Sequence, residues 1–406
     1  MKKTLFINGY IYIPGENAIK RTFYLFEMMR ERGMDVTFLT SDFNHYTKQK
    51  RDVNKFYSEY PEYKNCIKFL DMHPYKKNIS FSRYLSGNAF ENAAVEWFKN
   101  NGKEYDVVYV SLPASIIARK IKKYCDLYGC KLIIDVNDLW PDSLRLFLKN
   151  VTVYRALTYF IRKNVNKGYA NADGIVAVSN EYLEIANKVN RNATEKLSVY
   201  IGAMLDKFDL GVESYGTEII KDEEEFWIGY IGTLGRSYDI ETVIKAVDFL
   251  KKENGINIRF KIMGQGPAEE ELKRLVGKLG ATNIDFLGFM DYSKMAAYLS
   301  KCNATVNCIK ANASQSIINK VSDYFASGKP VLNCGPCKEM AALISDYSSG
   351  INYEAENVES LCGAINKLLT DSDFVERSGI NARNLAEKLF DRKKTHEQII
   401  EMIERI

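Results

Sequence analysis

The chain has 406 residues, 46% of them hydrophobic and 27% charged, and a formal net charge of +4. This composition excludes disordered and fibrous chains, and the length exceeds the roughly 250–300 residues at which one core divides, so we expect two domains. The small charge excess, with no basic arm or recognition motif, argues against a nucleic-acid partner.

The first half of the chain alternates short apolar runs with helical patterns, which predicts a parallel sheet in an α/β domain. Its first apolar run ends at Gly9, too early for a signal peptide, and no stretch approaches the roughly 20 apolar residues of a membrane span. We therefore expect a cytoplasmic protein, with any membrane contact peripheral and at the inner face. The expected strands are residues 4–8, 35–40, 106–111, 131–136 and 174–178.

Residues 206–225 lose periodicity among Gly, Asp and Glu, which predicts an interdomain linker. A second strand and helix alternation follows, and residues 391–406 predict a final helix. The expected second-sheet strands are residues 226–231, 258–263, 284–287, 304–306 and 330–333.

The segment from Ile318 to Val331 places Lys320 and Asp323 three residues apart at a predicted helix start. Residues at i and i+3 share a helical face, so Lys320 could neutralise a diphosphate while Asp323 accepts hydrogen bonds from ribose hydroxyls. Gly328 is expected to end this helix. The alternative is an amphipathic helix with two solvated charges.

This segment resembles the donor-binding region of GT-B glycosyltransferases, in particular the GT4-type family. Further blocks resemble that family in the family's order: residues 228–235, 261–267 and 283–290, and residues 135–143, which are similar to the D-x-x-D-L-W-P block of a capsule, O-antigen and exopolysaccharide branch. The resemblance implies two doubly wound Rossmann-like domains facing a central cleft. Residues 1–205 would bind the acceptor, residues 206–388 the nucleotide-sugar donor, and residues 389–406 would form a helix crossing back to the first domain.

The resemblance also implies a donor site on the loops that follow the strands. Gly232 and Gly235 would let backbone amides approach a phosphate, and Arg236 would supply a fork of donors. Where the family has two glutamates eight residues apart, this chain has Gln315 and Asp323, which leaves the donor sugar open. The expected donor-binding residues are Gly15, Glu16, Asn17, Gly232, Thr233, Leu234, Arg236, Gly264, Gly266, Phe289, Met290, Gln315, Ser316, Ile317, Lys320 and Asp323.

Two residues of the first domain are candidates for catalysis. Asp138 follows an apolar strand and could act as general base on an acceptor hydroxyl, could hold the acceptor, or could cap the helix that Pro141 begins. His45 resembles part of an F-x-H block of the same branch; the alternative is an exposed loop histidine. By analogy with GT4 the transfer would retain anomeric configuration, whereas an in-line base at Asp138 would invert it.

We expect no metal and no cofactor. The D-x-D formed by Asp371 and Asp373 follows a helix and predicts a helix cap, not a metal site. The eight cysteines lack a disulfide framework, and the C-G-P-C sequence from Cys334 to Cys337 is expected to be a strand-to-helix loop, with redox function the minor alternative.

Residues 153–167 predict a helix with basic and aromatic residues on one side and apolar residues on the other. Such a helix suits an anionic membrane surface and a polyprenyl-diphosphate-linked glycan acceptor; the alternative is a half-buried helix with a solvated face. We therefore expect a metal-independent glycosyltransferase of surface polysaccharide biosynthesis. The alternatives are a sugar-nucleotide 2-epimerase, which needs no acceptor, and a non-catalytic nucleotide-sugar binding protein.

Overall fold

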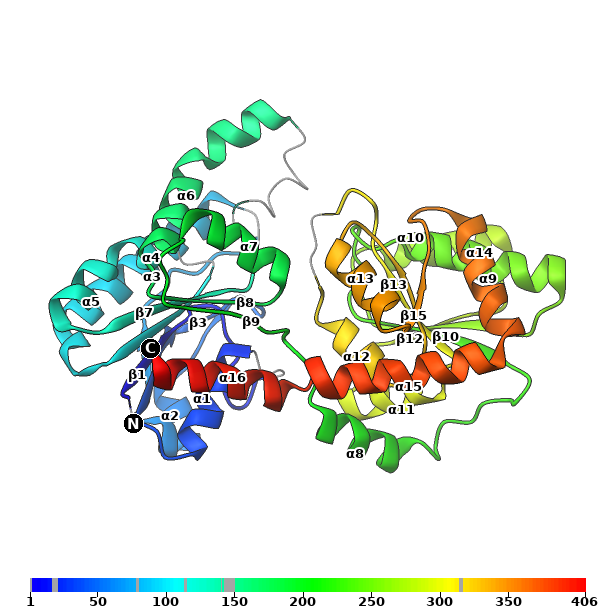
Figure 1. The fold of residues 1–406 in the computed structure, drawn as a ribbon, viewed down its shortest axis with the longest axis horizontal. Coiled ribbons are helices and arrows are strands. Elements are labelled where there is room, and N and C mark those ends of the chain that lie inside the picture. The colour runs from blue at the N-terminus through cyan, green and yellow to red at the C-terminus, as the bar shows by residue number, and fades with distance from the viewer. Residues whose placement is uncertain are drawn as a thin grey trace. The chain divides into compact units, whose positions relative to one another are not determined.

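The computed structural model describes residues 2–16, 21–77, 80–112, 115–139, 141, 150–313 and 317–406. The chain forms two compact units, one of residues 1–199 and 396–406 and the other of residues 200–395 (Figure 1). Each unit is built around a parallel sheet covered by helices on both faces.

The described part of the first unit contains a seven-stranded sheet in which every neighbouring pair is parallel. A short antiparallel hairpin of β3 (Phe43–Asn44) and β4 (Gln49–Lys50) follows β2. The strand order is β5 (Ile67–Leu70), β2 (Val36–Ser41), β1 (Thr4–Ile7), β6 (Val107–Ser111), β7 (Lys131–Val136), β8 (Gly174–Ala177) and β9 (Glu195–Ser198).

Two hydrophobic layers enclose this sheet. One face packs against α3 (Phe81–Asn101), α4 (Ser115–Lys120), α5 (Lys122–Tyr128), α6 (Val151–Asn171) and α7 (Asn180–Val189). The other packs against α1 (Arg21–Glu31), α2 (Val53–Glu59) and the C-terminal α16 (Arg392–Arg405) (Figure 1).

The second unit has six parallel strands in its described residues, in the order β12 (Ile284–Gly288), β11 (Ile258–Met263), β10 (Phe226–Ile231), β13 (Ala304–Cys308), β14 (Val331–Cys334) and β15 (Gly350–Asn352). One face packs against α9 (Ile240–Asn254), α10 (Glu269–Leu279) and α14 (Val358–Thr370). The other carries α8 (Leu205–Tyr215), α11 (Tyr292–Lys301), α12 (Lys320–Ala326), α13 (Lys338–Asp346) and α15 (Ser372–Leu389).

Both strand orders reverse at one point, which is where open parallel sheets bind ligands. In the first unit the reversal lies between β1 and β6, and in the second it lies between β10 and β13. The loops that leave the carboxyl ends of these strands are therefore the places to look for a site.

The α/β architecture and the strands expected from the sequence are confirmed. The helix that crosses back is confirmed too, because Ile399, Ile400, Met402 and Ile403 of α16 are buried in the core of the first unit. The expected linker at 206–225 is wrong. Residues 205–215 form α8, which buries Leu205 and Phe208 against α11, and the second unit already begins at Tyr200.

Helix α6 is half-buried, as in the alternative, but its exposed side is not only polar. Within the first unit its buried residues are Tyr154, Thr158, Val165, Gly168 and Tyr169. The apolar residues at its start face solvent instead, with exposed fractions of 63% for Leu157 and 72% for Phe160.

Candidate active site

Two loops interlock at the carboxyl ends of β10 and β11. A Cβ at Gly264 would lie 1.9 Å from the carbonyl oxygen of Gly232, and a Cβ at Gly266 would lie 2.5 Å from that of Leu234. The amide of Gly232 donates to Met263 at 2.8 Å, and that of Gly235 donates to Thr233 at 3.1 Å. These glycines therefore allow close packing of two loops, and the amides of Gly232 and Gly235 are used inside the protein. A phosphate beside this loop stays a prediction.

Lys320, the first residue of α12, extends over the Gly232 loop. Its ammonium donates to the Tyr230 hydroxyl at 2.8 Å and lies 4.1 Å from the ring centroid of Tyr230 and 3.7 Å from that of Tyr238. Burial lowers the pKa of Lys320 to about 7. Within the described residues it has no carboxylate partner, so the fold holds a desolvated cation beside the loop that follows β10.

Asp323 lies one helical turn further along α12. The Tyr292 hydroxyl donates to its carboxylate at 2.7 Å. Burial raises the pKa of Asp323 to about 6, although the Tyr292 hydrogen bond acts in the opposite direction. The cation and the carboxylate expected at this helix start are therefore both present and both partly desolvated.

The other predicted donor-binding residues of this unit differ in exposure. Thr233 and Arg236 are exposed in the loop after β10, and Phe289 is 75% exposed in the loop after β12. Leu234 is wholly buried and its amide donates to Gln265, so it belongs to the packing of the loop. Met290 and Ile317 pack partly against the core; Gln315 and Ser316 lie outside the described residues.

In the first unit, the loop after β1 carries Gly15 at a φ of +83° and then Glu16. The Glu16 carboxylate accepts hydrogen bonds from Arg51 at 2.8 Å, Asn44 at 2.8 Å and the Ile13 amide at 3.0 Å. Burial opposes ionisation, but these bonds outweigh it and lower the pKa of Glu16. Glu16 is thus engaged by protein donors, and Asn17 lies outside the described residues.

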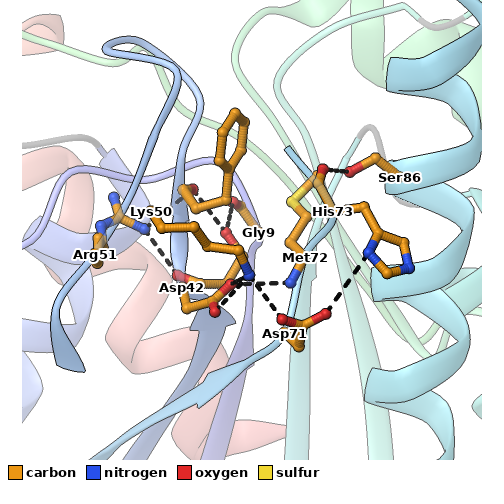
Figure 2. Close-up of polar contacts among 10 residues, drawn as sticks. Gly9, Asp42, Lys50, Arg51, Asp71, Met72, His73 and Ser86 are labelled. Atoms are coloured by element: carbon orange, nitrogen blue, oxygen red, sulfur yellow. Dashed lines mark hydrogen bonds and ion pairs between the residues drawn. The ribbon is translucent and has the colours of Figure 1, made fainter. Parts of the chain in front are cut away.

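The β3–β4 hairpin that carries His45 is anchored by a second network, drawn in Figure 2. Lys50 bridges Asp42 at 2.6 Å and Asp71 at 2.7 Å, and the Met72 amide donates to Asp42 at 2.9 Å. These contacts join the hairpin to the end of β5. Because the hairpin is fixed at its base, His45 has a defined position at the carboxyl edge of the sheet.

Aromatic side chains surround His45. Its Nδ1 is hydrogen-bonded to the Tyr75 hydroxyl, and its ring lies edge-on to Tyr10 at 5.3 Å and to Tyr46 at 5.1 Å. Tyr46 in turn stacks on Tyr12 at 4.1 Å. His45 is half-buried within this group, so the exposed-loop alternative is wrong.

Asp138 follows β7 and is half-buried. Burial raises its pKa, while the Leu139 amide and the charge of Arg83 lower it. Arg83 acts on the pKa of Tyr10, Tyr46 and Tyr75 as well, so it links Asp138 to the tyrosines around His45. The helix that Asp138 was expected to cap lies outside the described residues.

Sequence reasoning missed a buried ion pair beneath this edge. Arg21 and Asp135 lie 3.4 Å apart, with exposed side-chain fractions of 4% and 0%. Asp135 accepts from Asn137, which also donates to Ser111 at 2.6 Å. The pair thereby connects α1 to the carboxyl ends of β6 and β7, on one side of the switch point. An acid inside an otherwise apolar strand was the available signal.

The cysteine and D-x-D predictions are confirmed as structural features. Cys334 ends β14, Cys337 caps α13, and both thiols are buried, with the pKa of Cys334 raised by burial to about 11. Asp371 caps α15 by accepting from the Phe374 amide at 2.9 Å. Among the described residues, no group of three or more His, Cys, Asp or Glu could hold a metal ion, and no helix is long and apolar enough to cross a bilayer.

Residues 215–385 match the family model described as "Glycosyl transferases group 1", and this match covers the loops that bring Gly232, Gly264 and Lys320 together. Residues 215–385, which make up most of the second unit, therefore belong to the group 1 glycosyltransferases, the GT4 type. The chain is 23% identical over 301 residues to the "Putative colanic acid biosynthesis glycosyl transferase WcaI" of Escherichia coli (strain K12), covering 71% of each chain.

Solved structures share the GT-B fold of this chain over its whole length. Anabaena HepE, solved in complex with UDP, superposes with a TM-score of 0.70 at 14% identity and full coverage of both chains. WaaG, described as a glycosyltransferase involved in lipopolysaccharide biosynthesis, gives a TM-score of 0.68 at 16% identity, covering 98% of this chain and 99% of that one. At this identity the structural likeness concerns the fold.

Proposed function

We propose that this glycosyltransferase binds its nucleotide diphosphate sugar in the second unit and transfers the sugar without a metal ion to a glycan acceptor held by the first. The observation that carries the proposal is Lys320, a desolvated cation that lies over Gly232 at the switch point of the second sheet. A diphosphate would supply the counter-charge that the described residues do not, and charge neutralisation by Lys320 and exposed Arg236 would replace a metal.

Asp323 is placed to bind the ribose of the same nucleotide. It lies one turn from Lys320 on α12, and its carboxylate keeps acceptor capacity beyond the single bond from Tyr292. The exposed Phe289 ring in the loop after β12 would pack against the base. Because the structurally similar HepE was solved with UDP, we propose uracil as the base.

The acceptor would lie along the carboxyl edge of the first sheet. A cavity of about 370 Å³ beside the β1–α1 loop has aromatic walls from Tyr12 and Tyr60 and polar walls from Glu16, Arg51 and Lys55. Aromatic rings next to paired charges suit a carbohydrate, whose faces are apolar and whose edges are hydroxyl groups. Asp138 is the proposed base or acceptor-holding group and His45 the second candidate, at that same edge.

A polyprenyl-diphosphate-linked acceptor of surface polysaccharide biosynthesis is supported by the printed names of WcaI and WaaG and by the exposed side of α6. Leu157 and Phe160 are exposed beside Arg155 and Lys163. Helix α3 begins with a similar exposed group, in which Phe81 is 73% and Leu85 is 51% exposed.

Helix α3 follows β5 in the chain and α6 follows β7, and a helix that follows a strand of a parallel sheet starts on the side of the carboxyl edge, where ligands bind. Apolar residues flanked by cations suit the interface of an anionic bilayer. We propose that this edge contacts the inner face of the membrane. We also propose that the anomeric configuration is retained, in which case Asp138 would hold the acceptor. An inverted product in an NMR assay would overturn retention and would make Asp138 the in-line base.

The first test is a thermal-shift series with UDP, GDP, ADP, CMP and dTDP, each in Mg²⁺ and in EDTA. A nucleotide at about 100 times its dissociation constant adds roughly 2.7 kcal/mol of stability. We expect UDP to stabilise the protein equally in Mg²⁺ and EDTA. A shift seen only with Mg²⁺ would overturn metal independence, and stabilisation by no nucleotide would overturn the proposed donor site.

A further inference from the structure

The first unit has a second cleft, which the proposed reaction does not use. It lies between α3, α4 and α5 and has a volume of about 630 Å³. Asn92 and Glu96 of α3 form one side, and the other side is formed by Arg119, Lys120, Lys123 and Tyr124. Asn92 is eleven residues beyond the start of α3, or about 16 Å along the helix, so the cleft is well away from the carboxyl edge of the sheet.

The cleft has an excess of positive charge. The one carboxylate among its lining residues, Glu96, is paired with Lys99 at 3.0 Å. Lys120 donates to Asn92 at 2.7 Å and retains two further N–H groups. Across the described parts of the chain, neither Arg119 nor Lys120 nor Lys123 forms an ion pair.

Arg119 provides an independent indication of a ligand. Its Nε is buried and has no hydrogen-bond partner among the described residues. Buried donors are almost always paired, because leaving one unpaired forfeits the hydrogen bond it made to water. The Nε has almost no accessible surface, so an acceptor oxygen in the cleft would bind the terminal nitrogens of this guanidinium, and the side chain would have to turn for the Nε to join them.

The side chains that line the cleft indicate which class of ligand it would bind. A guanidinium presents a fork of donors that matches two oxygens of one phosphate, and two neighbouring ammonium groups add charge to the same oxygens. The Tyr124 ring, with the Lys123 ammonium 4.5 Å from its centroid, offers an apolar wall for an organic substituent. We propose that this cleft is a binding site for a phosphate ester, separate from the donor site.

Two sources could supply the ester: a soluble phosphate metabolite or the headgroup of an anionic lipid. Helix α4 packs tightly on α6, since a Cβ at Gly168 would lie 2.6 Å from that of Ala118. The cleft therefore belongs to the same helical layer as the exposed apolar start of α6. The experiment separates the two sources.

The test uses the full chain with glycerol 3-phosphate as the soluble probe, followed by thermal shift and calorimetry. The double variant Arg119→Gln/Lys123→Gln removes the fork and one ammonium. Its matched control, Lys188→Gln/Lys278→Gln, removes the same charge at two exposed lysines. Lys320→Ala is included because the proposed donor site could also take a phosphate.

We expect glycerol 3-phosphate to bind the wild type, the control and Lys320→Ala alike, and to bind the double variant at least about tenfold more weakly. Equal binding to wild type and double variant, or no binding to wild type, would overturn the proposal. Melting temperatures without ligand verify that the variants fold.

Sedimentation with phosphatidylcholine vesicles, with and without phosphatidylglycerol, then assigns the source. A lipid headgroup predicts that the double variant loses the phosphatidylglycerol-dependent binding. A soluble ester predicts that wild type and double variant sediment equally, while the difference in glycerol 3-phosphate affinity remains.

Discussion

The two units present opposite kinds of polar chemistry at the carboxyl edges of their sheets. In the second unit, Lys320 and Asp323 are partly desolvated and contact tyrosine hydroxyls; Lys320 has no carboxylate partner among the described residues, and the charge of Arg392 acts on Asp323. In the first unit, Glu16 is paired with Arg51, and Lys50 with Asp42 and Asp71. Unsatisfied charges in one unit indicate a place for a charged ligand, whereas satisfied charges in the other fix loops that present an aromatic surface.

We expect the largest loss of activity from a substitution in the first unit, if a side chain of that unit acts in catalysis. Asp138→Asn keeps the shape of the side chain but cannot accept a proton, so we expect kcat to fall by about 10²–10⁴ with the dissociation constant for UDP unchanged. The measurement is UDP release in the presence of acceptor. His45→Gln is the parallel variant, and whichever of the two leaves kcat intact is not the base.

The second-largest effect tests the charge of the donor site. Lys320→Ala removes charge-assisted hydrogen bonds worth roughly 1.5–3 kcal/mol each, so we expect UDP to bind about 100-fold more weakly. Calorimetry with UDP measures this directly. The control is Lys278→Ala, an exposed lysine of α10; similar losses in both variants would mean that overall charge, not position, governs binding.

Sequence patterns predicted the buried parts of this fold well, because a strand buried on both faces must be apolar along its length. They missed β5, β9 and β15, which are short and lie toward the edges of the sheets, where one side is free for polar residues. The same patterns did not predict α8, because this helix has too few apolar residues to show a helical spacing in the sequence.

The sequence predicted those parts of the candidate site whose residues are close together in the chain. It did not predict the contacts with residues that are distant in the chain. Lys320 and Asp323 are three residues apart, so the helical period alone places them together. Tyr230, Tyr238 and Tyr292, which enclose them, come from other elements, and no sequence spacing brings them there. Likewise Glu16 fell in the expected loop, but its partner Arg51 is 35 residues away.

The pH dependence of UDP binding is a smaller effect, and it tests whether Lys320 lacks an opposite charge in the nucleotide-free protein. Because burial lowers the pKa of Lys320 to about 7, the nucleotide-free protein loses this charge as pH rises above 7. We expect UDP affinity to fall by up to about tenfold per pH unit above that point. Lys320→Arg stays charged and should show a flat profile; the same decline in that variant would assign the titration elsewhere.

The lowered pKa of Lys320 also makes the free energy of unfolding depend on pH. Between pH 7 and 10.5 the unfolded state binds more protons at this lysine than the native state does, so its contribution to the free energy of unfolding rises with pH. Thermal denaturation of the nucleotide-free wild type against Lys320→Arg measures this difference.

The smallest effect concerns Asp323 and separates ribose binding from a purely structural role. Asp323→Asn retains an oxygen for the Tyr292 hydroxyl but loses the charge that strengthens a bond to a ribose hydroxyl, so we expect UDP to bind about fivefold more weakly, a loss of roughly 1 kcal/mol. Binding of 2′-deoxy-UDP should change less. Because burial raises the pKa of Asp323 to about 6, the wild-type carboxyl is protonated below that pH, and the difference between wild type and variant should disappear there. If UDP and its deoxy form lose affinity equally at every pH, Asp323 acts by shaping α12 rather than by contacting the sugar.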